Sequence, residues 1–250
     1  MLPRRLMPLC LVVAACSGPA RVVGEEPASV EEPSSDPGGS VDESSRAAPQ
    51  EFEGRRLAQT MSYLGADWLT RPERDDEENT TLLHQQLRLQ PGDVACDVGA
   101  GNGYHSLRMA EAVGPTGQVI ASDLQPEMLA LLRERAAAAG LANIATVLAR
   151  PGDPALPPRG CDLILLVDVY HEFARPEQAL AAMRDALSER GRVALVEYRA
   201  EDPDVPIKEL HKMSKRQILR EYTPRGYALV ESFDGLPWQH LMFFARDEPR

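Results

Sequence analysis

Short apolar runs alternate with amphipathic stretches of helical spacing across most of the chain, and this alternation constrains the fold more than any other feature. Runs typical of strands lie at 93–98, 118–123, 144–149, 161–169, 192–198, 227–232 and 240–246. Stretches with helical spacing lie between them at 105–113, 126–140, 176–191 and 214–222, and we expect Gly140 and Gly191 to end two of these helices. Strands that alternate with helices predict an α/β fold with a doubly wound, mainly parallel sheet of seven strands.

The size and charge of the chain limit what it can be. Its 250 residues are 43% hydrophobic, which is enough for one sizeable core. We therefore expect one globular domain at 51–250, in which residues 51–80 form a helical cap with Trp68 and Leu69 packed on the core. The charged run 71–78 is expected to be a solvated face. A net charge of −11 without a basic stripe argues against a nucleic-acid partner.

The stretch VACDVGAGNGYHS places three glycines within five positions directly after the first of these strands. Ligands of doubly wound sheets bind beyond the carboxyl ends of the strands, where glycines let backbone N–H groups approach a ligand. We therefore expect Gly99, Gly101 and Gly103 to border a ligand site. The dinucleotide fingerprint would need a glycine at position 104, where the chain has Tyr104, so an NAD site is disfavoured.

The same stretch resembles motif I of class I S-adenosylmethionine-dependent methyltransferases, acidic-x-G-x-G-x-G, and the resemblance covers at least residues 80–250. It implies S-adenosylmethionine as the cofactor. The cofactor-binding residues that it implies are Asp97, Gly99, Ala100, Gly101, Gly103, Asp123, Leu124, Gln125, Asp153 and Asp168. The segments GADWLTRPER, DVYHEF, VEYR and IKELHKMS are similar to a group of bacterial predicted methyltransferases that has no assigned substrate.

The resemblance also implies which part of the cofactor several of these residues contact. Asp123 would hydrogen-bond the ribose hydroxyls, and Leu124 and Gln125 would flank the adenine. Asp153 would face the adenine amino group. Asp168 would lie beside the methionine portion.

Two neighbouring residues after the fourth strand are predicted to be catalytic. Methyl transfer requires that the protein align the acceptor, exclude water and, for some acceptors, remove a proton. His171 is expected at the rim where the acceptor binds, and its imidazole can act as a base near neutral pH. Glu172 is its neighbour. The alternative is that His171 only shapes the pocket or caps a turn.

Several further polar residues are expected near the same rim. Residues 197–199 follow the fifth strand, and Arg199 either binds an anionic acceptor or forms a structural ion pair. His211 and Lys212 either belong to a lid or are structural. The histidines interpreted as structural are His84, His105 and His240.

Only Cys96 and Cys161 follow the N-terminal segment described next. Both lie in or beside apolar runs, so we interpret them as small buried hydrophobes without a disulfide framework. Two cysteines are too few for a thiolate metal site, and we expect no metal site.

The N-terminal residues 1–16 have the layout of a secretory signal, with Arg4 and Arg5 before a short apolar stretch. The stretch ends in VAAC and resembles a bacterial lipobox, which implies that a lipid on Cys16 anchors the exported protein to a membrane. An ordinary cleaved signal and a misassigned start codon are the alternatives, and in the second case the protein is cytoplasmic. Residues 17–50 are rich in Pro, Ser, Gly and Glu and predict a disordered acidic tether.

The function predicted from the sequence is methyl transfer from S-adenosylmethionine to an unidentified acceptor, expected to be a small molecule. The alternative is a membrane-tethered protein that binds a nucleoside-like ligand without turnover. This alternative stays open because S-adenosylmethionine is made in the cytosol, and the sequence does not explain how an exported domain would obtain it. An NAD oxidoreductase is a third and disfavoured alternative. Nothing in the sequence indicates an oligomeric state.

Overall fold

The computed structural model describes residues 50–247. The expected signal at 1–16, with Cys16, and the expected tether at 17–50, apart from its last residue, therefore lie outside the described residues. Among the described helices, none is long and apolar enough to cross a membrane.

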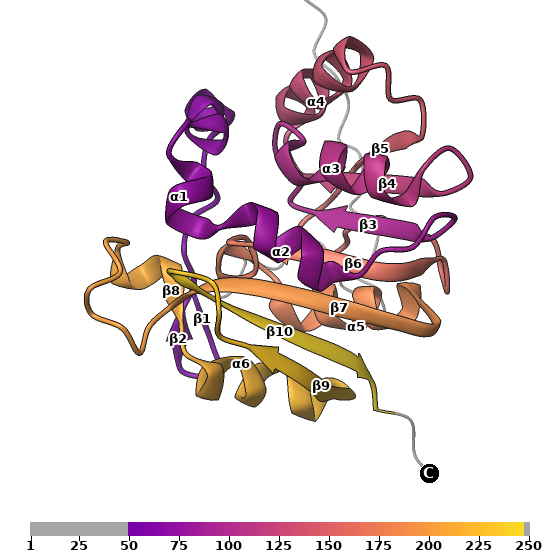
Figure 1. Cartoon of the computed structure of the whole chain (residues 1–250). Helices are drawn as coiled ribbons and strands as arrows, with labels where there is room; N and C mark the ends of the chain where they lie inside the picture. The colour runs from indigo at the N-terminus through magenta and orange to yellow at the C-terminus, as the bar shows by residue number, and fades with distance from the viewer. Residues whose placement is uncertain (1–49, 248–250) are drawn as a thin grey trace, which may run out of the picture. The chain divides into compact units, whose positions relative to one another are not determined.

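The domain is built around one twisted sheet, with helices between its strands (Figure 1). The strands are β1 (Glu51–Phe52), β2 (Arg55–Arg56), β3 (Val94–Val98), β4 (Gln118–Asp123), β5 (Ile144–Leu148), β6 (Cys161–Val167), β7 (Leu187–Arg199), β8 (Lys212–Met213), β9 (Tyr227–Phe233) and β10 (Gln239–Arg246). The α-helices are α1 (Arg74–Glu78), α2 (Thr80–Leu87), α3 (Tyr104–Val113), α4 (Pro126–Ala138), α5 (Pro176–Ala186) and α6 (Lys215–Tyr222). The 3-10 helices are η2 (Tyr63–Thr70), η3 (Tyr170–Glu172), η4 (Glu209–His211) and η5 (Thr223–Arg225).

The main sheet has eight strands, in the order β5-β4-β3-β6-β7-β10-β9, with β8 paired to β7 outside this path. All pairs from β5 to β7 are parallel, and β10 runs antiparallel to both β7 and β9. This arrangement confirms the predicted doubly wound, mainly parallel sheet and adds the two-residue strand β8 to the seven predicted strands. After β5 the chain crosses to the other side of β3, which opens a crevice at the carboxyl ends of β3 and β6.

Two apolar layers cover the two faces of the sheet. Because side chains alternate along a strand, Ala95 of β3 faces one layer and Cys96 the other. The Ala95 layer contains apolar residues of α2 and α3, and the Cys96 layer contains those of α5 and α6. Burial on both faces explains why β6 is almost wholly apolar in sequence.

The interpretation of the two cysteines as free thiols is wrong. Cys96 and Cys161 are both fully buried, as expected, but they are joined by a disulfide bond with a Cα–Cα distance of 5.9 Å. They lie 65 residues apart in sequence and come together because β3 and β6 are adjacent in the sheet. Sequence spacing gives no sign of this pairing, because the strand order decides it.

The third predicted helix ends earlier than expected. It stops at Ala186 and not at Gly191, because Leu187 is already extended and pairs with Cys161 at the start of β6. Gly191 lies within β7, and a Cβ at this position would be 2.5 Å from the carbonyl oxygen of Cys161. The glycine therefore permits close strand packing and does not end a helix.

The N-terminal cap contains a hairpin of β1 and β2 in addition to the expected helices. Trp68 does not pack on the core as expected, since 43% of its surface is exposed. The expectation of a solvated face at 71–78 is also wrong in part, because Arg74 and Glu78 are buried at 4% and 1% exposure. Arg74 lies on the inner side of α1, where it donates to Glu78 Oε2 at 2.8 Å and to the carbonyl oxygen of Leu69 at 2.7 Å.

Candidate active site

A cavity of about 580 Å³ lies at the carboxyl ends of the central strands. Its floor is formed by the loops after β3, β4 and β6 and by the turn 149–154. Residues of the N-terminal cap, among them Met61 and Trp68, line it from one side, and segment 206–211 lines it from another. The cavity falls within the range of small-molecule sites, which is about 300–1,000 Å³.

The glycine loop borders this cavity through Gly99 and Gly101. Its N–H groups do not point at a ligand as expected, because the amides of Gly99 and Ala100 both donate to the carbonyl oxygen of Ser122, at 2.8 and 3.0 Å. The Gly101 amide donates to Asp123 Oδ2 at 2.8 Å. The loop is therefore fastened to the end of β4, and the glycines serve close packing and positive φ angles.

Two of the predicted loop residues lie behind the cavity wall. Ala100 and Gly103 do not line the cavity, and a Cβ on Gly103 would meet the side chain of Leu132 in α4 at 2.6 Å. Asp97 also lies behind the wall, where Ser106 Oγ donates to its carboxylate at 2.5 Å. Burial raises the pKa of Asp97 to about 6, with a further contribution from the charge of Asp123.

The remaining predicted cofactor residues all line the cavity. They are Asp123, Leu124, Gln125, Asp153 and Asp168. Asp123 also accepts from the amide of Gln125 at 2.9 Å, and burial raises its pKa despite these hydrogen bonds. The Gln125 side chain bridges to the cap, since it donates to the carbonyl oxygen of Met61 at 2.9 Å and accepts from the amide of Tyr63 at 2.8 Å.

Asp168 carries an unsatisfied oxygen at this site. Its Oδ2 accepts from Gln239 Nε2 at 2.6 Å, whereas its buried Oδ1 has no hydrogen-bond partner among the described residues. Burial, together with the charges of Glu78 and Glu197, holds the pKa of Asp168 well above its ordinary value. A buried carboxylate without a partner is costly, and the ammonium group of a bound methionine portion would supply one. The unpartnered carboxylate oxygen of Asp168 therefore fits the ammonium group of S-adenosylmethionine.

A buried network that sequence reasoning missed closes the cavity next to Asp168. Arg74 lines the cavity and lies beside Glu78, and Glu78 Oε1 accepts from the hydroxyl of Tyr198 at 3.1 Å. Arg71 also donates to Glu78, at 2.6 Å. The spacing of these charges at 71, 74 and 78 is that of one helical face, and this signal could have identified the network.

The predicted catalytic residue His171 lines the cavity and is hydrogen-bonded to Glu197. Its Nδ1 lies 2.7 Å from Glu197 Oε2, and Glu197 Oε1 accepts from its backbone amide at 3.2 Å. Both side chains are buried, at 2% and 0% exposure. Burial alone would lower the pKa of His171, but the Glu197 carboxylate outweighs this effect and raises it.

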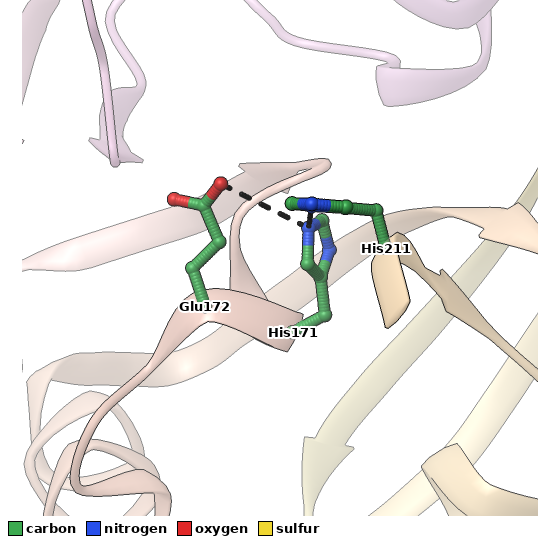
Figure 2. A group of neighbouring side chains, drawn as sticks. All are labelled: His171, Glu172 and His211. Atoms are coloured by element: carbon green, nitrogen blue, oxygen red, sulfur yellow. Dashed lines mark hydrogen bonds and ion pairs between the residues drawn. The ribbon is translucent and has the colours of Figure 1, made fainter. Parts of the chain in front are cut away.

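His211 and Glu172 face His171 from two sides, as Figure 2 shows. His171 Nε2 lies 3.0 Å from His211 Nδ1 and 3.9 Å from Glu172 Oε1. Burial lowers the pKa of His211 and raises that of Glu172 to about 7. The structure therefore brings both predicted catalytic residues together with His211, for which a lid and a structural role were the alternatives.

Several other polar residues that the sequence indicated lie outside the cavity lining. Arg199 does not line the cavity and forms no ion pair within residues 50–247, and it donates to the carbonyl oxygens of Asp234 and Pro237 at 2.8 and 2.9 Å. Lys212 does not line the cavity, and its ammonium donates to Glu209 at 2.9 Å. The histidines interpreted as structural lie outside the cavity lining: His84, His105 and His240.

The fold and the site define a class I S-adenosylmethionine-dependent methyltransferase. The family model described as a methyltransferase domain matches residues 89–240, which is more than half of the chain, and the chain belongs to this family. The fold is similar to that of a solved structure, a SAM-dependent methyltransferase from Aquifex aeolicus. The TM-score is 0.69 at 19% sequence identity, and the similarity covers 74% of this chain and 98% of that one. This likeness shows the shared fold.

Two curated relatives match shorter parts of the chain. The protein-L-isoaspartate O-methyltransferase of Ignicoccus hospitalis is 44% identical over 74 residues, which is 30% of this chain and 35% of that protein. The ubiquinone/menaquinone biosynthesis C-methyltransferase UbiE of Ectopseudomonas mendocina is 29% identical over 111 residues, 44% of this chain and 43% of that protein. The chain thus spans less than half the length of either relative. These similarities support methyl transfer with S-adenosylmethionine as cofactor.

Proposed function

We propose that this methyltransferase acts on a small molecule that binds in the same cavity as the cofactor, against His171, Glu172 and His211. The observation that carries the proposal is the continuity of the cavity. It extends from Gly99 and Asp123 at the cofactor end to the two histidines, and both the cap and segment 206–211 contribute to its walls. A cavity of this kind accepts a small molecule more readily than a folded protein.

The chain's own residues have distinct tasks in this proposal. Asp123 and Asp168 would hold the cofactor, which supplies an activated methyl group when it is bound. Apolar groups at the other end, among them Phe173 and Ile207, would exclude water and hold the body of the acceptor. The role of His171 and Glu172 in catalysis stays a prediction, and the proposal adds His211 to them.

The proposal is tested with the purified protein, S-adenosylmethionine and a panel of small hydroxyl and amine compounds. The expected result is release of S-adenosylhomocysteine that depends on one compound class and is lost in Asp123→Ala. Asp123→Ala should weaken cofactor binding about tenfold or more, since it removes a charged hydrogen-bond acceptor. Turnover with folded protein substrates alone would contradict a small-molecule acceptor. Cofactor binding without any turnover would favour the non-catalytic alternative.

We also propose that the protein is exported and anchored through Cys16. The buried disulfide between Cys96 and Cys161 supports export, because disulfides persist in oxidising compartments and are rare in the cytosol. Mass spectrometry of the mature N-terminus tests the anchor, and lipid on Cys16 that is lost in Cys16→Ser is the expected result. An unmodified Met1 on protein from the cytosol would contradict it.

A further inference from the structure

We propose that His171, Glu172 and His211 form a binding site for one divalent transition-metal ion at the acceptor end of the cavity. One nitrogen or oxygen atom from each of the three side chains lies within 4.8 Å of the others, and within the described residues no other such group of His, Cys, Asp or Glu is found. The proposal replaces the expectation of no metal site. It rests on the proposed function only in that an acceptor atom would complete the coordination.

The distances between these atoms are close to those of a metal site. Metal bonds of about 2.0–2.2 Å place the ligand atoms of a tetrahedral site about 3.2–3.6 Å apart. His171 Nε2 and His211 Nδ1 are separated by 3.0 Å, and Glu172 Oε1 lies 3.9 Å from His171 Nε2. A few tenths of an ångström separate the two His171 pairs from these values, whereas the ligand atoms of Glu172 and His211 lie within 4.8 Å of each other and would have to approach by up to about 1 Å. In Figure 2 the carboxylate of Glu172 and the ring of His211 both approach the ring of His171.

The hydrogen bonds of His171 prepare its outer nitrogen for a metal. Because Glu197 is an acceptor, the proton of a neutral His171 lies on Nδ1, which leaves the lone pair of Nε2 directed toward His211. Ligand histidines commonly donate their second N–H to a carboxylate in this way, which fixes the orientation of the ring. His211 would bind as the tautomer that carries its proton on Nε2.

His171 and His211 are both positioned by contacts with strand β7. Glu197 belongs to β7, and the next residue, Tyr198, pairs with Lys212 of β8, directly after His211. Strand β7 thus brings His171 and His211 together, although 40 residues separate them in sequence. Lys212 stabilises the η4 turn through Glu209. This preorganisation is what a metal site requires of its supporting residues.

The donor set indicates the kind of ion and its use. Two imidazoles and one carboxylate favour Zn²⁺ or another first-row transition ion over Mg²⁺ or Ca²⁺, which prefer oxygen ligands. Three protein ligands leave a position open for the acceptor. A hydroxyl bound there would have a lower pKa and would lose its proton to water, so the acceptor class is a small molecule whose methylated atom can bind the ion.

The test uses the full-length protein without a histidine tag, treated with chelator and then freed of it. Co²⁺ binding is followed by visible absorption, and Zn²⁺ binding by calorimetry. We expect one equivalent of either ion, a Kd raised at least tenfold in His211→Ala and Glu172→Gln, and a Kd raised about 10–100-fold in Glu197→Gln. His84→Ala is the matched control, because His84 lies outside the cavity lining and should leave the Kd unchanged.

Absence of this one-equivalent site, or equal affinity in His211→Ala and His84→Ala, would overturn the proposal. The contact between His171 and His211 would then be a hydrogen bond that holds segment 206–211 in place. The experiments can contradict the metal site and the proposed function independently of each other. Metal binding that His211→Ala abolishes, without turnover of any small molecule, contradicts only the proposed function. Turnover without metal binding contradicts only the metal site.

Discussion

Gln239 in β10 holds one carboxylate oxygen of Asp168 at 2.6 Å and leaves the other oxygen buried without a partner among the described residues. The two residues lie 71 positions apart, and the order of β6, β7 and β10 brings them together. We therefore expect the unsatisfied oxygen of Asp168 to contact the bound cofactor.

Asp168→Asn should therefore weaken binding of S-adenosylmethionine about tenfold or more while the melting temperature stays equal or rises. The neutral amide loses the charged contact with the cofactor but removes a costly buried carboxylate. Calorimetric titration and thermal melting of the same preparations measure both effects. Asp76→Asn, on the exposed side of α1, is the control. Unchanged cofactor affinity at position 168 would remove Asp168 from the site.

Gly101→Val should abolish cofactor binding at concentrations that saturate the wild type. A Cβ on Gly101 would lie 2.8 Å from Leu69 Cδ1 at the cavity wall, and its φ of +54° is also unfavourable for valine. Gly140→Val separates the two causes, because Gly140 has a φ of +70° and open space around the added Cβ. The control should lose about 1–3 kcal/mol of stability through backbone strain and keep its affinity. Normal binding by Gly101→Val would contradict the placement of the cofactor.

Reduction or removal of the Cys96–Cys161 disulfide should lower the free energy of unfolding by about 2–4 kcal/mol, because the bond closes a long loop in the unfolded chain. Urea denaturation of the oxidised protein, the reduced protein and the double variant Cys96→Ser/Cys161→Ser measures the loss. Reduction should have no effect on the double variant. If it destabilises that variant to the same extent as the wild type, the effect comes from elsewhere.

The contribution of His84 and His105 to stability should fall as the pH decreases from about 6.5 to about 4. Arg74 donates to His105 Nε2 at 3.1 Å, so the His105 proton lies on Nδ1 and is donated to His84 Nε2 at 3.0 Å. A proton on His84 Nε2 would break this chain. Burial lowers the pKa of His84 to about 4 and that of His105 well below its ordinary value, with the charge of Arg74 adding to both.

The sign of this effect follows from proton binding. Both histidines have folded-state pKa values below their unfolded values, so within this window they bind more protons in the unfolded chain, and their contribution favours unfolding in acid. His84→Gln keeps an acceptor for His105 without titrating. Its free energy of unfolding, relative to that of the wild type, should therefore increase when the pH falls from 7 to 5, as measured by urea denaturation of both proteins at the two values. An equal change would exclude His84 as a contributor.

The sequence by itself determined the fold class and several of the residues that line the cavity. Strand and helix periodicity depends on local alternation of apolar residues, and the acidic and glycine residues after β3 and β4 lie next to the strands that position them. Asp123, Leu124 and Gln125 could therefore be placed at the cavity from a short stretch of chain.

Only the tertiary structure decided which distant residues meet. The pairing of Cys96 with Cys161 and the contact of His171 with Glu197 and His211 depend on strand order and on the pairing of β8 with β7. Burial of Arg74 was not predicted, because a charged helix is ordinarily solvated, although the spacing of residues 71, 74 and 78 on one helical face could have indicated it. Local sequence specifies periodicity and turns, whereas these contacts between residues 26 to 65 positions apart arise only when the whole sheet has formed.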